Sequence, residues 1–423
     1  MTKPKYSLLK GFRDFYPEDL AARKWLLEKM REVSRRFGYQ EYEGPCLEPL
    51  GLYAAKSGEE LVRQQTFVLT DRGGEKLALR PELTPTLARM VAQKQADLPK
   101  PIRWFSIGPR WRYEKPQKGR TREFYQWDVD LLGAETPEAD AEIIAIAAEF
   151  LKSLGLTPKE VVIKVNNRRL MEEKLGFIEI PRRLIPQVFR AVDKKEKMKE
   201  KEWTSWLREI GLDNLQIKDL KGILQDKDFA GESEELTALV STLSDLGVGE
   251  FVEFDPTIVR GLDYYTGTVF EARDRQGKFR AILGGGRYDN LVEVVGGPRI
   301  SGVGFAAGDK VIEEVLRKFK KWPAANPVPT KVLVTVFDVS MYRNSLAVAR
   351  QLRQAGIPTE LYLTADKLDK QLKYADRQKI PYAVIIGPQE AEKSVVVLKK
   401  LATGEQTEIP PSKILKKIKD NHQ

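Results

Sequence analysis

Hydrophobic and polar positions alternate along the first third of the chain in patterns that predict helices and paired strands. Apolar side chains recur at helical spacing over residues 18–37, and Gly38 follows as a helix stop. Residues 39–45 have the pattern of a strand that a proline interrupts. Thr136 and Pro137 supply the N-cap and the first residue of a long apolar helix that extends to about Leu154. The other elements predicted here are a hairpin of strands 66–71 and 76–80, a helix from about Pro85, and strands 102–114 and 122–132.

The character of the sequence changes near residue 166. From there to about residue 250 it is helical, strongly charged and poor in glycine. Strand-like and glycine-rich sequence resumes over residues 258–272 and 279–292. This order predicts a helical subdomain, residues 166–250, inserted between two parts of one domain, residues 1–165 and 251–322.

A third region follows a Pro- and Ala-rich linker at residues 323–330. Short apolar runs alternate there with helical segments, which predicts a small α/β domain over residues 331–423 with a mostly parallel sheet. The predicted strands are 332–337, 359–364, 382–387 and 394–400, and the predicted helices are 341–355, 368–379 and 412–419.

Composition removes several kinds of chemistry. Cys46 is the only cysteine, so an internal disulfide and a multi-cysteine zinc site are impossible. His422 is the only histidine and lies next to the C-terminus, which argues against a Ser-His-Asp triad or a histidine-rich metal site. Catalysis would therefore use carboxylates, arginines, lysines, tyrosines, backbone groups or a bound metal, as in phosphoryl or adenylyl transfer.

Charge and hydropathy suggest a partner and a compartment. Seventy-one Lys and Arg against 61 Asp and Glu give a net charge of +10, which suits a polyanionic partner and equally suits a well-solvated basic protein. No apolar run approaches the ~18 residues of a membrane span, and the first residues resemble neither a signal nor a transit peptide. A cytoplasmic protein with no membrane partner is expected.

The densest chemical signal is the segment from Arg110 to Gln126, two strands joined by a basic loop. Guanidinium groups fixed on paired strands bind phosphate oxygens bidentately, so the segment is a candidate phosphate cradle. On residue types alone, a charged surface hairpin remains an equal interpretation.

Five strings in the sequence resemble one family. FSIGPRWRYEKPQKGRTREFYQWDVD (105–130) resembles motif 2 of class II aminoacyl-tRNA synthetases in its histidyl form. The other four resemble the motif 1 segment, the amino-acid-binding loop, the histidyl signature and the glycine-rich strand that follows it: GYQEYEGPCLEP (38–49), LRPELT (79–84), RGLDYYTGTVFE (260–271) and GGGRYDNL (284–291). The resemblance runs nearly end to end. It implies an α+β catalytic domain with an antiparallel sheet, a helical insertion and a C-terminal α/β anticodon-binding domain.

The resemblance to the histidyl-tRNA synthetases implies roles for four charged residues. Arg112 is implied to bind the α-phosphate of ATP together with the histidine carboxylate, and Arg260 to be the second arginine on that phosphate. Two guanidiniums that flank the reacting phosphorus would supply fixed positive charge where negative charge develops. Glu114 and Arg120 are implied to line the ATP site.

The same resemblance implies a histidine site. An α-amino group needs an anion, and an imidazole needs polar partners for both ring nitrogens. Asp130 is shorter than the glutamate found in many bacterial relatives, so the contact with histidine is expected to be longer or water-mediated. Taken singly, each of these residues more often has a structural role, and only their order along the chain favours a site. The residues carried over are Glu82 and Thr84 at the amino group with Gln126 beside them, Asp130, Tyr264 and Tyr265 at the imidazole, and Arg112 at the carboxylate. Leu83 and Arg260 are also implied to line the histidine site.

Motif 3 departs from the family pattern. Relatives usually have Gly-Phe-Ala-x-Gly-x-Glu-Arg, whereas here Gly308 is followed by Asp309-Lys310-Val311. Val311 therefore stands where the arginine that meets adenine and the γ-phosphate is expected. Lys310 or Arg299 could supply the missing cation, or ATP binds less tightly; a lysine would act as a point charge and would not stack on adenine as arginine does.

The remaining implied ligands and partners are Mg²⁺, tRNA and a second subunit. Mg²⁺ would neutralise the triphosphate, although no dedicated metal site is legible in the sequence. Lys115 and Gln117 resemble residues that meet the acceptor end of tRNA(His), and Pro45 resembles a residue of the class II homodimer interface. The charged run 191–203 and the Lys-rich last helix are expected to be solvated faces, with tRNA contact as the alternative.

One alternative comes from another functional class. The synthetase-like regulatory subunit of ATP phosphoribosyltransferase shares the catalytic fold but does not aminoacylate. Such proteins lack the anticodon-binding domain and generally lose the RGLDYY signature, and both features are present here.

Overall fold

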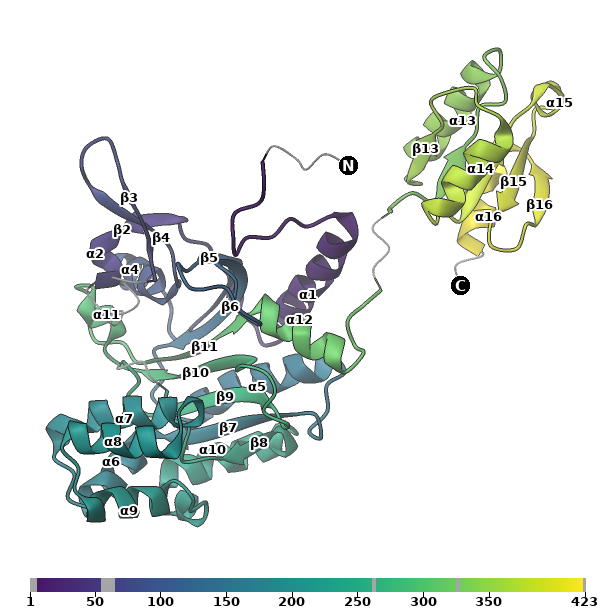
Figure 1. Ribbon diagram of the computed structural model, residues 1–423. Helices are drawn as coiled ribbons and strands as arrows, with labels where there is room; N and C mark the ends of the chain where they lie inside the picture. Colours follow the sequence, from purple (N-terminus) through teal and green to yellow (C-terminus); the bar gives the residue numbers. More distant parts are fainter. Residues whose placement is uncertain (1–5, 55–64, 261–263, 325–327, 421–423) are drawn as a thin grey trace. The chain divides into compact units, whose positions relative to one another are not determined.

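The computed structural model of the protein describes residues 6–54, 65–260, 264–324 and 328–420. The chain divides into two compact units: the larger spans residues 1–14 and 23–323, and the smaller spans residues 15–22 and 324–423. Figure 1 shows both units with their elements labelled.

An eight-stranded sheet is the framework of the larger unit. Its inner strands pair antiparallel, and only the two edge strands, β1 and β8, pair parallel to their neighbours. This matches the antiparallel sheet that the family resemblance implies. In spatial order the strands are β1 (Gln40–Glu41), β5 (Ile102–Trp111), β6 (Glu123–Leu132), β11 (Gly302–Gly308), β10 (Leu283–Tyr288), β9 (Thr268–Asp274), β7 (Val161–Asn167) and β8 (Val252–Phe254).

Helix α5 (Pro137–Ser153) covers one face of this sheet. Thr136 caps it as expected, because its side chain accepts a hydrogen bond from the backbone N–H of Ala139. Trp127 of β6 projects towards the helix and packs edge-to-face on Phe150, at 4.7 Å between ring centroids, and on Phe305 of β11 at 4.9 Å. The opposite face of the same strands is left for polar side chains.

Several predicted elements are confirmed with small changes of boundary. The first helix is α1 (Pro17–Arg36), whose apolar side of Leu26, Met30 and Val33 is completely buried. The segment predicted as one strand over 39–45 forms only the short β1, and pairing resumes after Pro45 in β2 (Leu47–Pro49). The predicted hairpin is β3 (Phe67–Thr70) with β4 (Lys76–Leu79), which with β2 forms a three-stranded sheet, and the helices beside it are α2 (Leu50–Ala54) and α4 (Thr84–Lys94).

The helical region begins two residues later than the sequence suggested. Asn166 and Asn167 end strand β7, and the Asn167 side chain accepts hydrogen bonds from the N–H groups of Arg169 and Leu170, so it caps the first helix. Trp203 anchors the middle of the region, fully buried and donating from Nε1 to the carbonyl of Ala191 at 2.8 Å. The helices are α6 (Arg168–Phe177), α7 (Ile185–Lys194), α8 (Glu200–Ile210), α9 (Asn214–Ile223) and α10 (Glu234–Asp245), with short 3₁₀ turns between several of them.

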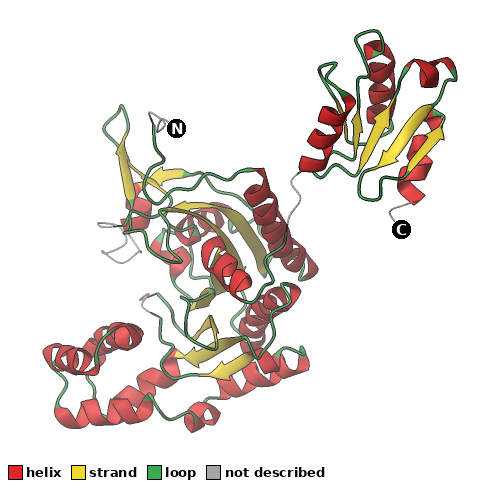
Figure 2. Cartoon of the chain, turned by 45° about the vertical axis from the view of Figure 1, so that its right-hand side comes forward, coloured by secondary structure: helices red, strands yellow, loops and turns green. Residues whose placement is uncertain are grey.

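The helices of this region differ in what they contact. Helix α10 packs along α5 beside the sheet, whereas α7 and α8 pack against each other. Figure 2 shows most of the helices of the region gathered at one end of the larger unit. Their apolar side chains and those of the sheet form one continuous core cluster. This helical region is therefore built onto the sheet of the larger unit and shares its hydrophobic interior.

The smaller unit has a mixed sheet, and the expectation of a mostly parallel one was wrong. Strand β12 pairs parallel with β13 and β14, but β14–β15 and β15–β16 are antiparallel. The last strand was missed because its residues alternate between exposed and half-buried positions with little apolar character. The elements are β12 (Val332–Val334), α13 (Tyr342–Gln354), β13 (Thr359–Leu361), α14 (Leu368–Arg377), β14 (Tyr382–Ile385), α15 (Pro388–Glu392), β15 (Val396–Lys400), β16 (Gln406–Ile409) and α16 (Ile414–Asp420).

Among the described residues, no helix is both long enough and apolar enough to cross a bilayer.

The glycine-rich strand β10 yields a stability prediction. A Cβ on Gly285 would overlap the carbonyl oxygen of Gly304 and lie 2.7 Å from Cα of Phe305, both backbone atoms that cannot move aside. Gly285→Ala is expected to lower the free energy of unfolding by about 3 kcal/mol or more, measured by urea denaturation. Gly222→Ala in α9 is the control, because a Cβ there meets nothing within 4 Å and alanine favours a helix; an equal loss in both variants would contradict the close-approach explanation.

Candidate active site

A cleft of about 870 Å³ opens over the polar face of the eight-stranded sheet. Strands β6, β10 and β11 form its floor, and the loop between β5 and β6, the start of α12 (Asp309–Lys318) and the end of α7 form its sides. Most of the residues predicted from the sequence line this one cleft. They are Glu82, Thr84, Arg112, Glu114, Arg120, Gln126, Asp130, Arg260, Tyr264, Tyr265 and Lys310.

Strand alternation accounts for the floor of the cleft. In β6, the apolar side chain of Trp127 faces the core, and Gln126, Asp128 and Asp130 face the opposite way. Asp128 is buried and forms an ion pair of 2.8 Å with the buried guanidinium of Arg110. Its other oxygen accepts a hydrogen bond of 2.5 Å from the Gln126 amide. Gln126 was predicted as a site residue from the sequence, but Asp128, which fixes the orientation of Gln126, was not.

A buried tyrosine, Tyr288, contacts Asp130, and the half-buried Tyr264 lies beside that tyrosine. The hydroxyl of Tyr288 donates to Asp130 Oδ1 at 2.6 Å, and the Tyr264 ring lies near both Tyr288 and Tyr265, with centroids 6.2 and 4.7 Å away. Burial raises the pKa of Tyr264 and Tyr288, and for Tyr288 the charge of Asp130 raises the pKa further, so both hydroxyls keep their protons. Tyr288 lies within the GGGRYDNL string but was assigned no role; its contact with Asp130 joins strands that are distant in the sequence.

The loop between β4 and α4 carries the first part of the predicted amino-acid site. Glu82 and Thr84 line the cleft. Leu83, predicted beside them, is fully buried and does not line it. Arg80 holds the loop, since its buried guanidinium donates to the carbonyls of Gly44 and Pro109 at 2.7 and 3.0 Å. Arg112 ties the loop to the cleft by donating from Nε to the carbonyl of Pro81 at 3.0 Å.

Arg260 reaches the cleft from a strained backbone position. Its φ of +55° lies in the left-handed region that a non-glycine residue adopts only when its surroundings impose it. Its guanidinium lies against β10, where a Cβ on Gly284 would be 2.7 Å from Cζ of Arg260. The glycine at this position therefore makes room for the arginine. Gly261, Leu262 and Asp263 of the histidyl signature fall outside the described residues.

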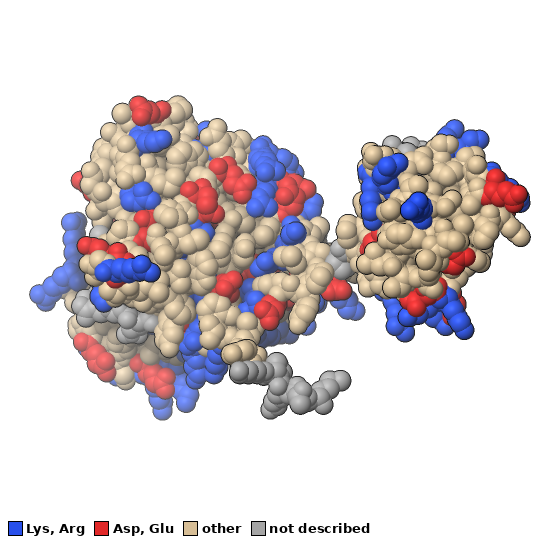
Figure 3. Space-filling model, turned by 90° about the horizontal axis from the view of Figure 1, so that it is seen from above, with Lys and Arg blue, Asp and Glu red and all other residues tan. Residues whose placement is uncertain are grey.

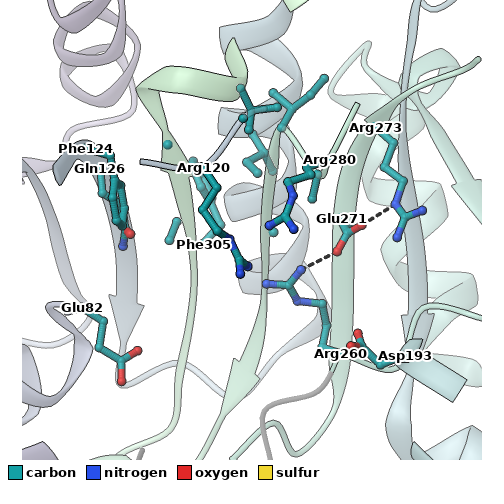
Figure 4. A pocket seen from close by; sticks show the side chains of 18 of the residues that line it. Glu82, Arg120, Phe124, Gln126, Asp193, Arg260, Glu271, Arg273, Arg280 and Phe305 are labelled. Atoms are coloured by element: carbon teal, nitrogen blue, oxygen red, sulfur yellow. Dashed lines mark hydrogen bonds and ion pairs between the residues drawn. The ribbon is translucent and has the colours of Figure 1, made fainter. Parts of the chain in front are cut away.

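A chain of opposite charges connects Arg260 to the insertion. Arg260 Nη1 pairs with Glu271 Oε2 at 2.5 Å, Glu271 also pairs with Arg273, and Arg273 pairs in turn with Glu196 of the insertion. Figure 4 shows the first three in line, with Asp193 next to Arg260. Burial raises the pKa of Glu271, but the two facing guanidiniums outweigh burial and hold the pKa below its ordinary value. Glu271 is thus a buried, ionised anchor for Arg260.

The charged run 191–203 has a second environment besides solvent. Many of its side chains are exposed, as expected for a solvated face. However, Asp193, Lys194, Glu196 and Lys197 also line the cleft. A charge run has the same composition whether it faces water or a cleft, so composition alone does not distinguish the two environments.

The loop between β5 and β6 places charges at the cleft and at the surface. Arg120 Nε pairs with the buried carboxylate of Glu114 at 2.5 Å. Burial lowers the pKa of Arg120, the charge of Glu114 raises it, and the nearby charges of Arg280 and Arg112 lower it, with a lowered pKa as the result. Lys115 and Gln117 lie on the exposed outer part of the loop.

The unusual motif 3 begins helix α12. Buried Asp309 accepts hydrogen bonds from the Arg13 guanidinium at 2.8 Å and from the N–H of Tyr125 at 3.1 Å, which ties the start of the helix to β6. Lys310 lines the cleft but pairs with Glu313 at 3.3 Å and with Glu314 at 3.9 Å.

Two other positions bear on the missing motif 3 cation. Val311, at the arginine position, is buried at 8% exposure and lines the cleft. Arg299, considered as a replacement, pairs with Glu135 at 3.1 Å and does not line the cleft.

A metal site built from protein side chains alone is absent among the described residues. Among them, no group of three or more His, Cys, Asp or Glu side chains could hold an ion. Mg²⁺ bound to a triphosphate needs only one or two protein carboxylates beside phosphate oxygens and water. Glu114 and Glu271 line the cleft and are of that type.

Fold and cleft together define a class II aminoacyl-tRNA synthetase, with an antiparallel sheet that carries charged side chains on its open face. The sequence profile of the Histidyl-tRNA synthetase family matches residues 11–312, and that of the Anticodon binding domain matches residues 331–421. Similar proteins include Histidine--tRNA ligase of Haloarcula marismortui, 39% identical with 96% of each chain covered. Another is Histidine--tRNA ligase, chloroplastic/mitochondrial, of Arabidopsis thaliana, 39% identical with 95% of this chain and 84% of that protein covered.

Solved structures agree with these sequence matches. The crystal structure of histidyl-tRNA synthetase from Nostoc sp. PCC 7120 aligns with a TM-score of 0.81 at 27% identity, and the alignment covers 99% of this chain and 100% of that one. The chain therefore belongs to the histidyl-tRNA synthetase family.

Removing the Glu271 carboxylate tests the anchor of Arg260. Glu271→Gln leaves two guanidiniums facing a neutral amide, so the free energy of unfolding is expected to fall by about 3–5 kcal/mol. Because the pKa of Glu271 is lowered in the folded protein, its stabilising contribution is present above the ordinary value near 4.5 and is lost as the pH falls below it. The stability gap between wild type and variant should therefore narrow under acid. Glu253→Gln, which breaks the more exposed pair with Arg275, is the control and should cost about 1 kcal/mol or less; equal losses would contradict the assignment.

Proposed function

We propose that the protein ligates histidine to tRNA(His) in two steps. A carboxylate oxygen of L-histidine attacks the α-phosphorus of ATP, the bond to the β-phosphate oxygen breaks, and pyrophosphate leaves histidyl-adenylate behind. A hydroxyl of the terminal tRNA ribose then attacks the carbonyl carbon, and AMP leaves. The observation that carries this proposal is the convergence of residues from five separate segments of the chain on one cleft.

Arg112 and Arg260 would act on the reacting phosphate. Each already has a partner that sets its direction, the carbonyl of Pro81 for Arg112 and the carboxylate of Glu271 for Arg260. Guanidiniums held in this way stabilise developing charge without having to reorganise during the reaction. Burial lowers the pKa of Arg260, but facing carboxylates, Glu271 first, outweigh burial and raise it, so Arg260 stays charged throughout.

The end of the cleft near Asp130 would hold the imidazole of histidine. Asp130 and Tyr264, with Tyr265 beside them, offer polar groups within a buried surrounding. Leaving such groups unpaired is costly, so an amino acid without two ring nitrogens would bind poorly. Glu82, Thr84 and Gln126 would meet the α-amino group, and Leu83 would act through its backbone alone, because its side chain belongs to the core.

Members of this family use ATP, and the other end of the cleft would hold it. Glu114, Arg120 and Lys310 line that end. Mg²⁺ would supply charge neutralisation between phosphate oxygens. The protein side chains would orient the nucleotide and keep the α-phosphate between the two arginines.

The outer loop and the smaller unit would bind tRNA. Lys115 and Gln117 are exposed beside the cleft, where an acceptor end could reach the adenylate. Figure 3 shows Lys and Arg interspersed with Asp and Glu over the visible face.

The domain organisation remains as proposed from the sequence. Residues 1–165 and 251–322 would form the catalytic domain, 166–250 the insertion, 323–330 the linker and 331–423 the anticodon-binding domain. The two units have separate apolar cores, which supports the boundary before the anticodon-binding domain, whereas residues 166–250 share the core of the larger unit.

The anticodon-binding profile also decides against the main alternative. A synthetase-like regulatory subunit of ATP phosphoribosyltransferase is expected to lack this domain, whereas the profile matches residues 331–421 here. A cytoplasmic location is proposed, although the relative from Arabidopsis thaliana is named as chloroplastic/mitochondrial.

Pyrophosphate exchange with each amino acid in turn tests the activity. Histidine alone should support ATP–pyrophosphate exchange, and the purified protein should then charge tRNA(His).

Arg260→Ala is expected to reduce exchange by a factor of about 10² to 10³, because one of two guanidiniums at the phosphate is lost. Circular dichroism should show that this variant is folded. Exchange that does not depend on histidine, or a variant with nearly full activity, would refute the proposal.

We also propose a homodimer that uses the three-stranded sheet near Pro45. The strand register puts Leu47, Pro49 and Leu69 on one face of this sheet, and all three are exposed. An exposed apolar sheet face of this kind is typical of an interface.

Charge placed on this face should weaken association. Leu69→Glu is expected to shift the protein from dimer to monomer in sedimentation equilibrium, because a buried carboxylate would lack a partner. Leu215→Glu, on an exposed position of α9, is the matched control and should leave the mass unchanged. A Leu69→Glu protein that remains dimeric would exclude this face.

A further inference from the structure

The replacement of the motif 3 arginine by Val311 leaves the ATP end of the cleft short of one cation at that position. Lys310 is an incomplete substitute, because its ammonium group is shared between Glu313 and Glu314 of the same helix. Arg299 is paired with Glu135 outside the cleft. A cation that replaces the motif 3 arginine would therefore come from another residue that lines the cleft.

Arg280, in the loop between β9 and β10, occupies the space beside Val311. If Gly119 carried a Cβ, that atom would lie 3.5 Å from Cγ2 of Val311 and 3.6 Å from Cδ of Arg280. The side chains of Val311 and Arg280 therefore both lie beside Gly119 in the loop between β5 and β6. The Glu314 carboxylate lies there too, with Oε2 at 3.5 Å from the same position. Figure 4 shows the Arg280 side chain directed into the cleft, towards Arg120 and Arg260.

The Arg280 side chain is also uncommitted within the part of the chain that the structure describes. It forms no ion pair and no hydrogen bond there, whereas Arg120 is paired with Glu114 and Arg260 with Glu271. Its charge is close enough to Arg120 to lower the pKa of that residue, so two guanidiniums face the same space. Like charges gathered in a cleft are stabilised by a polyanion that binds between them.

We propose that Arg280, on a strand loop outside motif 3, binds the terminal phosphates of ATP in place of the missing motif 3 arginine. The proposal rests on the function proposed above. Arg280 provides a planar fork for two phosphate oxygens, and Lys310 of α12 adds a point charge. The terminal phosphates are thus bound by a residue that precedes the glycine-rich strand β10, and Val311, in the first turn of α12, is free to be apolar.

Kinetics of histidine-dependent pyrophosphate exchange test this assignment. Arg280→Ala is expected to raise the KM for ATP about 10- to 100-fold, because a charge-assisted contact with ATP is lost. The KM for histidine should change less than about threefold. Arg280→Lys should fall between wild type and alanine, and Lys310→Ala should raise the KM for ATP less than Arg280→Ala does. Competition by AMP, which lacks the terminal phosphates, should be the same in Arg280→Ala as in wild type.

Arg275→Ala is the matched control. This substitution removes the same charge from the same loop. Arg275, however, pairs with Glu253 and does not line the cleft. A KM for ATP in Arg280→Ala within twofold of wild type, or an equal rise in Arg275→Ala, would overturn the proposal. A wild-type protein without histidine-dependent exchange would instead overturn the proposed function. Calorimetric titration with Mg·ATP then tests Arg280 separately: weakened binding in Arg280→Ala alone supports it, and unchanged binding refutes it.

Discussion

Positive charge concentrated in one cleft has to be held in place before a substrate arrives, and the buried carboxylates of this protein meet that requirement. Arg120 and Arg260 line the cleft and pair with the carboxylates of Glu114 and Glu271, and the buried Arg110 pairs with Asp128, which also lines the cleft. Each pairing fixes the direction of a guanidinium, and the carboxylate partner is buried in all three pairs. If one carboxylate were lost, repulsion between neighbouring guanidiniums would change the geometry on which phosphate chemistry depends.

The same few strands make both the core and the site, because strand alternation sends neighbouring side chains to opposite faces. Trp127 packs on α5, and the residues beside it, Gln126 and Asp128, enter the cleft. The glycines of β10 belong to this arrangement as well. Gly285 allows close backbone approach to β11, and Gly284 leaves the volume that the Arg260 guanidinium occupies. Core packing and site geometry therefore cannot vary independently in this sheet.

The insertion is coupled to the chemistry by charge. Glu196 of the insertion contacts Arg273, which shares Glu271 with Arg260. A displacement of this part of the insertion would alter the surroundings of the arginine proposed to act on the α-phosphate. The charge run that contains Glu196 thus has a structural use that its composition does not indicate.

Local patterns in the sequence determined the helices, the paired strands and the ordered strings that carry the family resemblance, because these depend on neighbouring residues. The helix start at Thr136 and the hairpin of β3 and β4 are examples, since a cap and a turn act within a few positions. Tertiary structure decided what depends on segments distant in the chain. It brought Tyr288 to Asp130 and Arg280 to the space beside Val311, and it turned part of a charged helix towards the cleft. It also made the sheet of the smaller unit mixed, because strand direction depends on how the connections fold back and not on the composition of the strands.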